Sequence, residues 1–396
     1  MIYSFMTQQR YNTSLIIFFD FILYSDTQNY WVSDSHILFI ESVRKAFAKS
    51  TLCARLSGET APNGLQIPND ITVQPLPFYT DLLQLLIKKP LLFWKIKKRF
   101  EQVIGKTDIL WLCWPHPVSF MLILIYGRTH FIFLSVRENI EDVIREKYPF
   151  YNKFFGILLV KLMNVVLRLF FPKLTIFCTG SEMYQRYRPY FEHVYQIKSP
   201  LISNQPIEVK TELDQNSITK LLFVGRLERV KGLSYLIEAM SIVNATDSHI
   251  HLDIVGTGTE IKHLTQLIEK YKLNDSVTLH GYVPYGEALF DFYRYTDLFI
   301  LPALTEGFPK VIDEARAFNL PIIATLSGGI GNELSHGENV WIIEKKSAES
   351  IADAILTLKN DQELAQRISR PTETIQPDYY SDKIISIVQS AFQSDS

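Results

Sequence analysis

Short apolar runs alternate with segments of helical length from residue 219 onward. The apolar runs are residues 221–224, 252–255, 277–279, 298–301, 322–324 and 341–343. The segments between them that have helical length and periodicity are residues 233–243, 260–271, 285–295, 311–318 and 350–358. Strands that alternate with helices form βαβ units, which assemble into a parallel sheet covered by helices on both faces. The pattern therefore predicts a Rossmann-like domain in the second half of the chain.

The first half shows the same alternation less regularly. Its predicted strands are residues 21–24, 52–55, 72–75, 109–113, 131–134 and 175–178. Residues 199–217 are polar and lack periodicity, which is typical of a linker. Since 396 residues are many for one domain, we predict an α/β chain with two Rossmann-like domains, residues 1–200 and 201–377. A last amphipathic helix, residues 378–396, is expected to pack back on the first domain.

Composition excludes several classes of protein. Hydrophobic residues make up 47% of the chain and charged residues 21%, which is typical of a globular protein and not of a disordered one. The net charge of −2 gives no general attraction for nucleic acid. Cys53, Cys113 and Cys178 are far apart and form no CxxC motif, so we expect neither a disulfide framework nor a zinc site. This cysteine usage fits a reducing cytoplasm.

Two apolar segments raise the question of a membrane. In residues 15–24, Asp20 interrupts the run and no small-residue cleavage site follows, so a buried strand is favoured over a signal peptide. Residues 154–171 carry two cations and an asparagine, and charges at a helix centre are costly in hydrocarbon. We predict no transmembrane helix.

Two cations follow the first strand of the second half. That strand ends at Gly225, and Arg226 and Lys231 precede the next helix. An Arg side chain offers phosphate a planar fork of donors, and Lys offers a compact positive charge. A diphosphate beside a helix start would meet both cations and free main-chain N–H groups. The competing interpretation is a basic loop on a solvated edge.

Glycine turns follow two other strands of the same half. The strand at residues 252–255 runs into Gly256 and Gly258, and the strand at residues 322–324 leaves toward Gly328 and Gly329. Such turns let the main chain approach a ligand closely, although Gly-x-Gly alone is weak evidence.

Two carboxylates, Glu306 and Glu314, stand on either side of a predicted helix start near Lys310. Glu306 follows the strand at residues 298–301, and Glu314 is expected about one turn into the helix. Ligands of open α/β sheets bind at the carboxyl ends of the strands, so both carboxylates are placed to bind one polyhydroxylated ligand. The competing interpretation is a solvated helix start, where acidic residues are common.

Taken in order, these motifs resemble those of the group 1 (family 4) glycosyltransferases. The motifs are Gly-Arg-Leu-x₃-Lys-Gly at 225–232, Ile-Val-Gly-x-Gly at 254–258, Glu-Gly-Phe-Pro-x₄-Glu-Ala at 306–315 and Gly-Gly at 328–329. Members of that family are retaining, nucleotide-sugar-dependent enzymes of GT-B fold, in which two Rossmann-like domains face each other across a cleft. The resemblance runs from about residue 219 to residue 358.

The resemblance implies a role for each charged residue of the motifs. Arg226 and Lys231 would hold the donor diphosphate, Glu306 would contact the transferred sugar as a catalytic residue, and Glu314 would bind the ribose hydroxyls. The other donor contacts that it implies lie at Gly225, Gly256, Gly307, Phe308, Pro309, Lys310 and Val311. No Asp-x-Asp pair lies near these loops, and the two cations can stabilise the leaving group themselves, so we expect no metal and no cofactor.

In the first half the resemblance is thinner. Family members often carry a His after the strand that corresponds to residues 109–113, where it touches the donor sugar, so His116 is the catalytic candidate on the acceptor side. A structural His between two prolines is the competing interpretation. Many family members also have a glycine-rich loop after the first strand, whereas residues 25–33 contain no glycine.

Residues 82–106 are rich in cations and aromatic side chains. The cations are Lys88, Lys89, Lys95, Lys97, Lys98, Arg99 and Lys106. Together with Phe93, Trp94 and Phe100 they suit an anionic membrane surface, for which residues 154–171 are a second candidate. The competing interpretations are a solvated basic helix for the first segment and a helix packed on the sheet for the second.

The combined prediction is a glycosyltransferase that moves a sugar from a nucleotide-sugar donor to a glycan or a polyprenyl-lipid-linked acceptor, with retention of configuration. The expected setting is bacterial surface polysaccharide or glycolipid synthesis, in the cytoplasm and peripheral to the inner face of the plasma membrane. Two alternatives stay open: a non-catalytic nucleotide-binding partner of another transferase, and a nucleotide-sugar epimerase or phosphorylase on the same fold. Product analysis without an acceptor would reveal an epimerase or phosphorylase, and the absence of nucleotide release with donors and membrane lipid extract would favour the non-catalytic partner.

Overall fold

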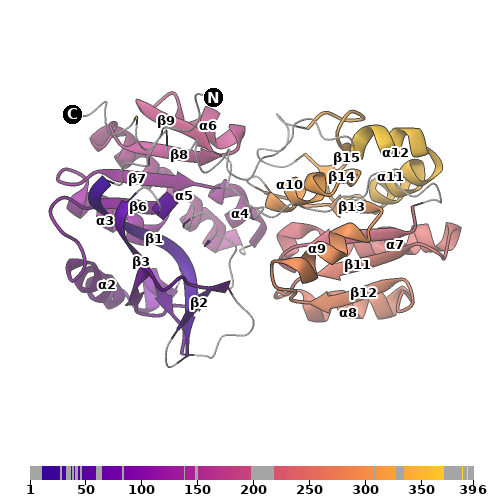
Figure 1. Cartoon of the computed structure of the whole chain (residues 1–396), viewed down its shortest axis with the longest axis horizontal. Helices are drawn as coiled ribbons and strands as arrows, with labels where there is room; N and C mark the ends of the chain where they lie inside the picture. Colours follow the sequence, from indigo (N-terminus) through magenta and orange to yellow (C-terminus); the bar gives the residue numbers. More distant parts are fainter. Residues whose placement is uncertain are drawn as a thin grey trace, which may run out of the picture.

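The structure is a computed structural model with two sheets, one in each half of the chain (Figure 1). It describes residues 11–26, 29–32, 37, 40, 43–44, 47–58, 65–82, 84–137, 139–147, 150–197, 218–306, 309–326, 334–369, 386 and 390. The predicted α/β class with two Rossmann-like sheets is confirmed.

The first sheet is built around the long strand β1. Its strands are β1 (Tyr11–Ser25), β2 (Tyr30–Val32), β3 (Phe47–Leu56), β4 (Leu65–Gln66), β5 (Ile71–Leu76), β6 (Ile109–Trp114), β7 (Ile132–Val136), β8 (Thr175–Thr179) and β9 (His193–Ile197). The parallel part has the order β5-β3-β1-β6-β7-β8-β9, and β2 and β4 add an antiparallel extension at the end of β1. The strand order therefore reverses at β1, between β3 and β6.

Helices pack on this sheet between its strands. They are η1 (Gln84–Lys88), α2 (Leu91–Glu101), α3 (Pro117–Tyr126), α4 (Ile140–Lys147), α5 (Phe150–Phe170) and α6 (Ser181–Tyr187). A single hydrophobic core joins one face of the sheet to α2, α3, α5 and α6, through side chains such as Phe100, Leu122, Leu167 and Tyr187. These four helices therefore cover the same face.

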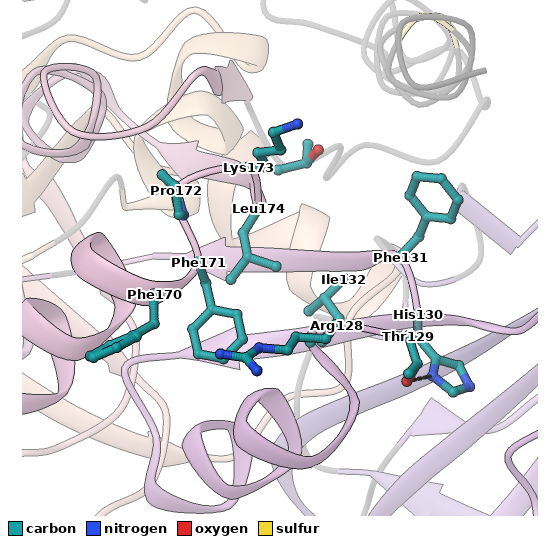
Figure 2. Close-up of a pocket in the computed structure, with 12 residues that line it drawn as sticks. Arg128, Thr129, His130, Phe131, Ile132, Phe170, Phe171, Pro172, Lys173 and Leu174 are labelled. Atoms are coloured by element: carbon teal, nitrogen blue, oxygen red, sulfur yellow. Dashed lines mark hydrogen bonds between the residues drawn. The ribbon is translucent and has the colours of Figure 1, made fainter.

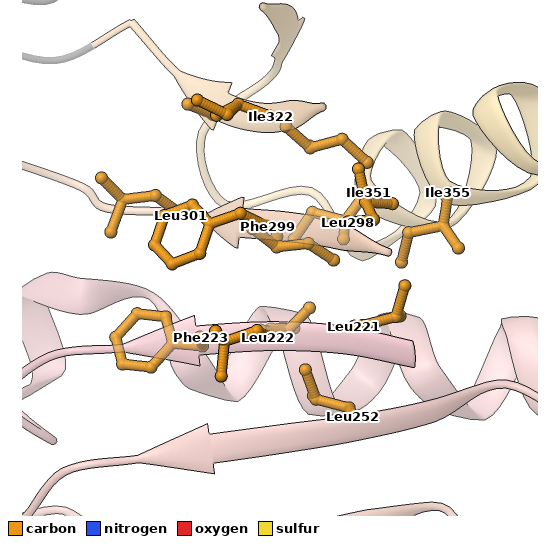
Figure 3. Close-up of a cluster of buried hydrophobic side chains, with 14 of the residues drawn as sticks. Leu221, Leu222, Phe223, Leu252, Leu298, Phe299, Leu301, Ile322, Ile351 and Ile355 are labelled. Carbon is orange, nitrogen blue, oxygen red and sulfur yellow. The ribbon is translucent and has the colours of Figure 1, made fainter. Parts of the chain in front are cut away.

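The second sheet is entirely parallel. Its strands are β10 (Lys220–Val224), β11 (His251–Val255), β12 (Val277–Gly281), β13 (Leu298–Leu301), β14 (Ile322–Thr325) and β15 (Trp341–Ile343), in the order β12-β11-β10-β13-β14-β15. The accompanying helices are η2 (Arg229–Lys231), α7 (Leu233–Thr246), α8 (Ile261–Lys270), α9 (Glu287–Arg294), α10 (Lys310–Ala317), α11 (Ala348–Asn360) and α12 (Gln362–Ser369). Side chains of the central strands meet those of α11 in the core (Figure 3).

All six strands predicted for the second half are present, because strands buried on both faces are continuous apolar runs. In the first half, the expectation of a strand at residues 21–24 was too short. β1 starts at Tyr11 and continues through Asp20, whose charge is paired inside the protein as described below. β2, β4 and β9 were not predicted. The proposed linker at 199–217 lies outside the described residues, and of the proposed helix at 378–396 only Ser386 and Ser390 are described.

Candidate active site

The predicted donor-binding residues lie where the strand order of the second sheet reverses. This point is between β10 and β13, which are neighbours in the sheet although they are far apart in sequence. Ligands of open α/β sheets bind outside the carboxyl ends of the strands at such a point. β10 ends at Val224 and leads to Arg226, and β13 ends at Leu301 and leads to Glu306. The two loops of the motif therefore share one edge.

An ion pair joins these loops. The Lys231 ammonium contacts a carboxylate oxygen of Glu306, and the two side chains are only 12% and 14% exposed. The main chain also links the loops, since the N–H of Leu304 donates to the carbonyl of Val230 at 2.7 Å. Gly232, with φ of +71°, allows this approach, because a Cβ there would lie 2.1 Å from the carbonyl oxygen of Pro302. The structure thus brings together two residues predicted to bind one donor.

Lys231 can keep this contact and still bind phosphate. An ammonium group has three N–H donors, and the contact with Glu306 uses one side of it. The side chain of Arg226 is much more exposed, at 68%, and its guanidinium lies 3.0 Å from a carboxylate oxygen of Glu228. A mostly covered cation, Lys231, and an exposed one, Arg226, therefore follow the same strand end.

Glu314 lies in α10 and is buried. The hydroxyl of Tyr293, in α9, donates to its Oε2 at 2.5 Å. Burial raises the pKa of Glu314, while the Tyr293 hydroxyl and the Lys310 ammonium lower it in part. Because a carboxylate has two oxygens with two lone pairs each, this single bond orients Glu314 and leaves acceptor capacity for a ribose hydroxyl.

The start of α10 lies at the same edge. Pro309 is its N-cap, in extended conformation, and Lys310 and Val311 form its first turn. The first N–H groups of a helix have no partner within the helix and attract anions. Gly307 and Phe308 lie outside the described residues, as do Gly328 and Gly329.

The glycine turn after β11 packs on the loop that carries Arg226. The N–H of Gly225 donates to the carbonyl of Val255 at 3.0 Å. A Cβ on Gly256 would lie 1.9 Å from the carbonyl oxygen of Gly225, and one on Gly258 would lie 2.3 Å from that of Leu227. These glycines therefore allow close contact between two main chains. That Gly256 also contacts the donor stays a prediction.

A cluster of charged and polar side chains lies at the corresponding point of the first sheet. β1 pairs with β6 only as far as Phe18 and Leu112, and Asp20 follows where these two strands part. The Asp20 carboxylate accepts a hydrogen bond from the Tyr79 hydroxyl at 2.6 Å and lies 2.9 Å from Nε of Arg55. Sequence reasoning missed all three functional candidates, although a charge inside an apolar run was a signal, because buried charges are usually paired.

His116 belongs to the same cluster. It is the N-cap of α3, and its Nδ1 accepts the N–H of Val118 at 3.1 Å, which leaves the ring proton for Nε2. Nε2 lies 3.6 Å from Oδ2 of Asp20 and 3.5 Å from the Tyr79 hydroxyl oxygen. His116 is only 5% exposed, so its ring is held inside the cluster.

Asp20 is the most accessible charged group of this cluster. Its side chain is 28% exposed, against 9% for Arg55 and 6% for His116. Burial alone would raise the pKa of Asp20, but the interactions with His116, Arg55 and Tyr79 lower it to about 2. Burial and the nearby Asp20 carboxylate raise the pKa of the Tyr79 hydroxyl, which therefore stays protonated and donates. Asp20 is a permanent anion at working pH.

The carboxyl-end edges of the two sheets face each other. α4 follows the carboxyl end of β7, η2 follows that of β10, and these two elements contact one another. Figure 1 shows α4 and α10 between the two sheets. The Asp20 cluster and the Lys231–Glu306 pair are thus on the facing sides of the two halves. In the described part of the chain, no group of three or more His, Cys, Asp or Glu residues is arranged to hold a metal ion.

Comparisons with known proteins point in one direction. Residues 206–374 match the family model described as "Glycosyl transferases group 1". An uncharacterized glycosyltransferase of Haemophilus influenzae is 28% identical over 256 residues, which cover 63% of this chain and 69% of that protein. The putative colanic acid biosynthesis glycosyltransferase WcaL of Escherichia coli is 29% identical over 185 residues, and this match spans 45% of its length and 44% of this chain.

The fold is also found among solved structures. WaaG, a glycosyltransferase involved in lipopolysaccharide biosynthesis, superimposes with a TM-score of 0.68 at 11% sequence identity, over 95% of this chain and 99% of that one. At this identity the match speaks for the fold alone, and that fold is GT-B. The architecture predicted from the sequence is therefore confirmed for both halves of the chain.

Proposed function

With a carboxy-terminal domain that belongs to the group 1 glycosyl transferases, this chain is a glycosyltransferase of GT-B fold, and we propose that it moves a sugar from a nucleotide-sugar to a glycan or a polyprenyl-lipid-linked acceptor. The observation that carries the proposal is the Lys231–Glu306 pair at the point where the strand order of the second sheet reverses. The resemblance to WcaL favours bacterial surface polysaccharide or glycolipid synthesis as the setting.

The donor diphosphate binds between Lys231, Arg226 and the first turn of α10. Negative charge grows on this diphosphate as the bond to the sugar breaks, and fixed donors placed where charge develops lower the barrier. Lys231 is held in place by Glu306, so it does not have to reorganise during the reaction. Two cations and a helix start stabilise the negative charge of the departing diphosphate, a task that a bound divalent metal ion can also perform. We therefore propose that the reaction needs no metal.

Glu306 and Glu314 bind different parts of the donor. Glu306 is next to the cation that holds the phosphate, so it is placed to accept hydrogen bonds from the transferred sugar. Glu314 lies deeper, in α10, with its orientation set by Tyr293, and binds the ribose hydroxyls. Neither acts as a general acid or base in this proposal.

Transfer retains the anomeric configuration through attack on the face that the diphosphate leaves. The bond between the anomeric carbon and the phosphate oxygen breaks, the bond to the acceptor oxygen forms on the same face, and the acceptor proton goes to the departing phosphate. Asp20, which is ionised and the most accessible charge of its cluster, orients the acceptor hydroxyl. His116, whose Nε2 lies 3.6 Å from Oδ2 of Asp20, helps to orient the Asp20 carboxylate and lines the sugar site.

The enzyme works at the inner face of the plasma membrane. In α2, Leu91 and Trp94 are exposed, and the Lys98 ammonium lies 3.8 Å from the centre of the Trp94 ring. The cations of residues 82–106 supply long-range attraction to anionic lipid. Among the described residues, no helix is both long and apolar enough to cross a bilayer.

Donor binding is tested by thermal unfolding with a panel of nucleoside diphosphates and nucleotide-sugars. A ligand of the folded state raises the melting temperature, and the base that binds is the one that gives the shift. Lys231→Ala is expected to weaken this binding by about 10- to 100-fold, because it removes a charge-assisted contact. Lys270→Ala, in an exposed cation at the far end of α8, is the matched control. If the ligand raises the melting temperature equally in both variants, Lys231 does not bind the donor.

A further inference from the structure

The helix α5 exposes a continuous row of large apolar side chains. They are Phe154, Phe155, Leu158, Leu162, Val165 and Leu169, each between 47% and 72% exposed, and we call them the α5 face. At 3.6 residues per turn these six positions fall within a sector about 100° wide. The row therefore runs along one side of the helix over nearly its whole length.

The opposite side of α5 is firmly anchored, so the exposed row does not result from poor packing. Met163 and Leu167 are buried in the core under the helix layer. Asn164 accepts hydrogen bonds at 3.0 Å from the indole N–H of Trp114 and from the Tyr187 hydroxyl, and it donates to the carbonyl of Val160. The helix has one side for the core and a different apolar side for solvent.

The charged side chains of α5 itself and of the loop that follows α3 are all cations, whereas carboxylates lie on α4 and at Glu192, whose main-chain N–H donates to the carbonyl of Pro172. Residues 117–132 and 150–175, which form α3, α5 and the loops at their ends, contain no Asp or Glu. They carry the cations Arg128, Lys153, Lys161, Arg168 and Lys173. The Arg168 guanidinium lies 3.6 Å from the centre of the Tyr190 ring, on the flank of the row. In a protein with a net charge of −2, this is a local excess of positive charge.

A cavity of about 510 Å³ opens where α5 ends (Figure 2). Its lining comes from residues 127–132 and 170–175, at the amino ends of β7 and β8. Phe171 and Leu174 are buried in its wall, and Arg128 and Lys173 are among the residues that line it. An apolar wall with cations at its rim suits the acyl chain and the phosphate of a lipid.

From these observations we propose that the α5 face is the surface that seats on an anionic lipid bilayer. Apolar side chains next to cations match the boundary between the acyl chains and the head groups. A second copy of the chain fits less well, because the cations that α5 itself carries would be brought together across a symmetric contact. In the sequence, residues 82–106 are the first candidate for a membrane surface and residues 154–171 the second, and in the structure the larger apolar surface belongs to α5.

This placement also explains how a lipid-borne acceptor reaches the site, a step that rests on the proposed function. α5 follows α4 at the carboxyl edge of the first sheet and runs to the amino edge. α4 contacts η2, which contains Lys231. The Phe154 end of the α5 face is therefore at the edge of the sheet that carries the active site, where the head group of a bound lipid can enter.

Flotation with vesicles of phosphatidylglycerol and phosphatidylcholine in equal parts tests the proposal. Phe155→Ser combined with Leu162→Ser is expected to weaken binding by about 100-fold or more, because each large apolar side chain contributes roughly tenfold or more on burial. Ile242→Ser with Ile261→Ser, at exposed positions of the second domain, is the matched control and keeps wild-type binding. Binding to pure phosphatidylcholine is expected to be weaker.

Three outcomes would overturn the proposal. The first is unchanged flotation of the α5 double variant, and the second is loss of flotation only in Leu91→Ser with Trp94→Ser in α2. The third is a wild-type dimer that the α5 variant dissociates in light scattering, which would assign the face to a second copy. Thermal shifts with nucleoside diphosphates stay as in wild type in the α5 variant, so a failure of this proposal is distinguishable from a failure of the donor site.

Discussion

At the residue scale, Asp20 shows how a charge is kept inside a strand. Its carboxylate meets the Arg55 guanidinium, the Tyr79 hydroxyl and Nε2 of His116, each from a different element of the first domain. Arg55 in turn donates to the carbonyl of Tyr79 at 2.5 Å, and its guanidinium lies 4.5 Å from the centre of the Tyr79 ring. The ion pair is thus fixed by several contacts, which keeps the anion where β1 and β6 part.

This arrangement predicts a pH-dependent stability difference between the wild type and Asp20→Asn. The pKa of Asp20 falls from 3.8 to about 2 on folding, which corresponds to about 2 kcal/mol of stability. Because the folded-state pKa is the lower one, this stability is present above about pH 4 and is lost as the pH falls toward 2. Urea unfolding is measured for both proteins from pH 3 to pH 8. The difference between their free energies of unfolding should be constant at high pH and should become smaller below pH 4. If this difference in free energy does not change between pH 3 and pH 8, the lowered pKa assigned to Asp20 in the folded state is contradicted.

Some site residues could be predicted from the sequence, and others could not. Arg226, Lys231, Glu306 and Glu314 stand in motifs that follow apolar runs, so their place at the strand ends was predictable. The contact between Lys231 and Glu306 was not, because it depends on two loops that are 75 residues apart in sequence. The Asp20 cluster draws on residues from β1, β3 and two loops, and a linear pattern contains no information on that meeting.

At the element scale, the loop that carries Arg226 depends on the turn after β11. Gly256 has φ of +138°, and its missing side chain makes room for the carbonyl of Gly225. Gly256→Ala is expected to lower the free energy of unfolding by about 3 kcal/mol and to weaken donor binding, since the Arg226 loop must move. Gly286→Ala is the matched control, with φ of +131° and no atom within 4 Å of a Cβ.

The control has the same backbone strain without the clash, so the difference between the two variants isolates the contact of the turn with the loop. We expect Gly256→Ala to be less stable than Gly286→Ala by about 2 kcal/mol in chemical denaturation. Equal stabilities would mean that the two main chains separate at little cost, and the turn would then have no role in positioning Arg226.

The strands of the second half were predictable because they are buried on both faces and therefore read as short apolar runs. α5 shows the limit of this reasoning. Its sequence is apolar on most sides, so periodicity alone does not tell which side meets the core and which meets solvent. The structure resolves this through Asn164, a polar residue that points inward to Trp114 and Tyr187. β1 was predicted too short, because the apolar runs considered began at residue 15 or 21, whereas the strand starts at Tyr11 and continues through Asp20.

At the scale of the whole molecule, the two sheets face each other with the edges at which the carboxyl ends of their parallel strands lie. Each sheet reverses its strand order once among the described strands, at β1 and at β10, and each reversal carries a charged group. The second has a cation paired with a carboxylate, which we propose binds the donor, and the first has an ionised aspartate, which we propose orients the acceptor. The α5 face starts at this edge of the first sheet, so the proposed donor site, acceptor site and membrane surface form one continuous arrangement.

Turnover of nucleotide-sugars in the presence of membrane lipid extract and EDTA tests the central claim most directly. We predict that the wild type releases nucleoside diphosphate from one donor with EDTA present, and that Lys231→Ala releases it about 10²- to 10³-fold more slowly, because the leaving group loses a fixed cation. Release that EDTA abolishes and Mg²⁺ or Mn²⁺ restores would contradict the metal-independent mechanism. No release from any donor, or wild-type release by Lys231→Ala, would contradict the account as a whole.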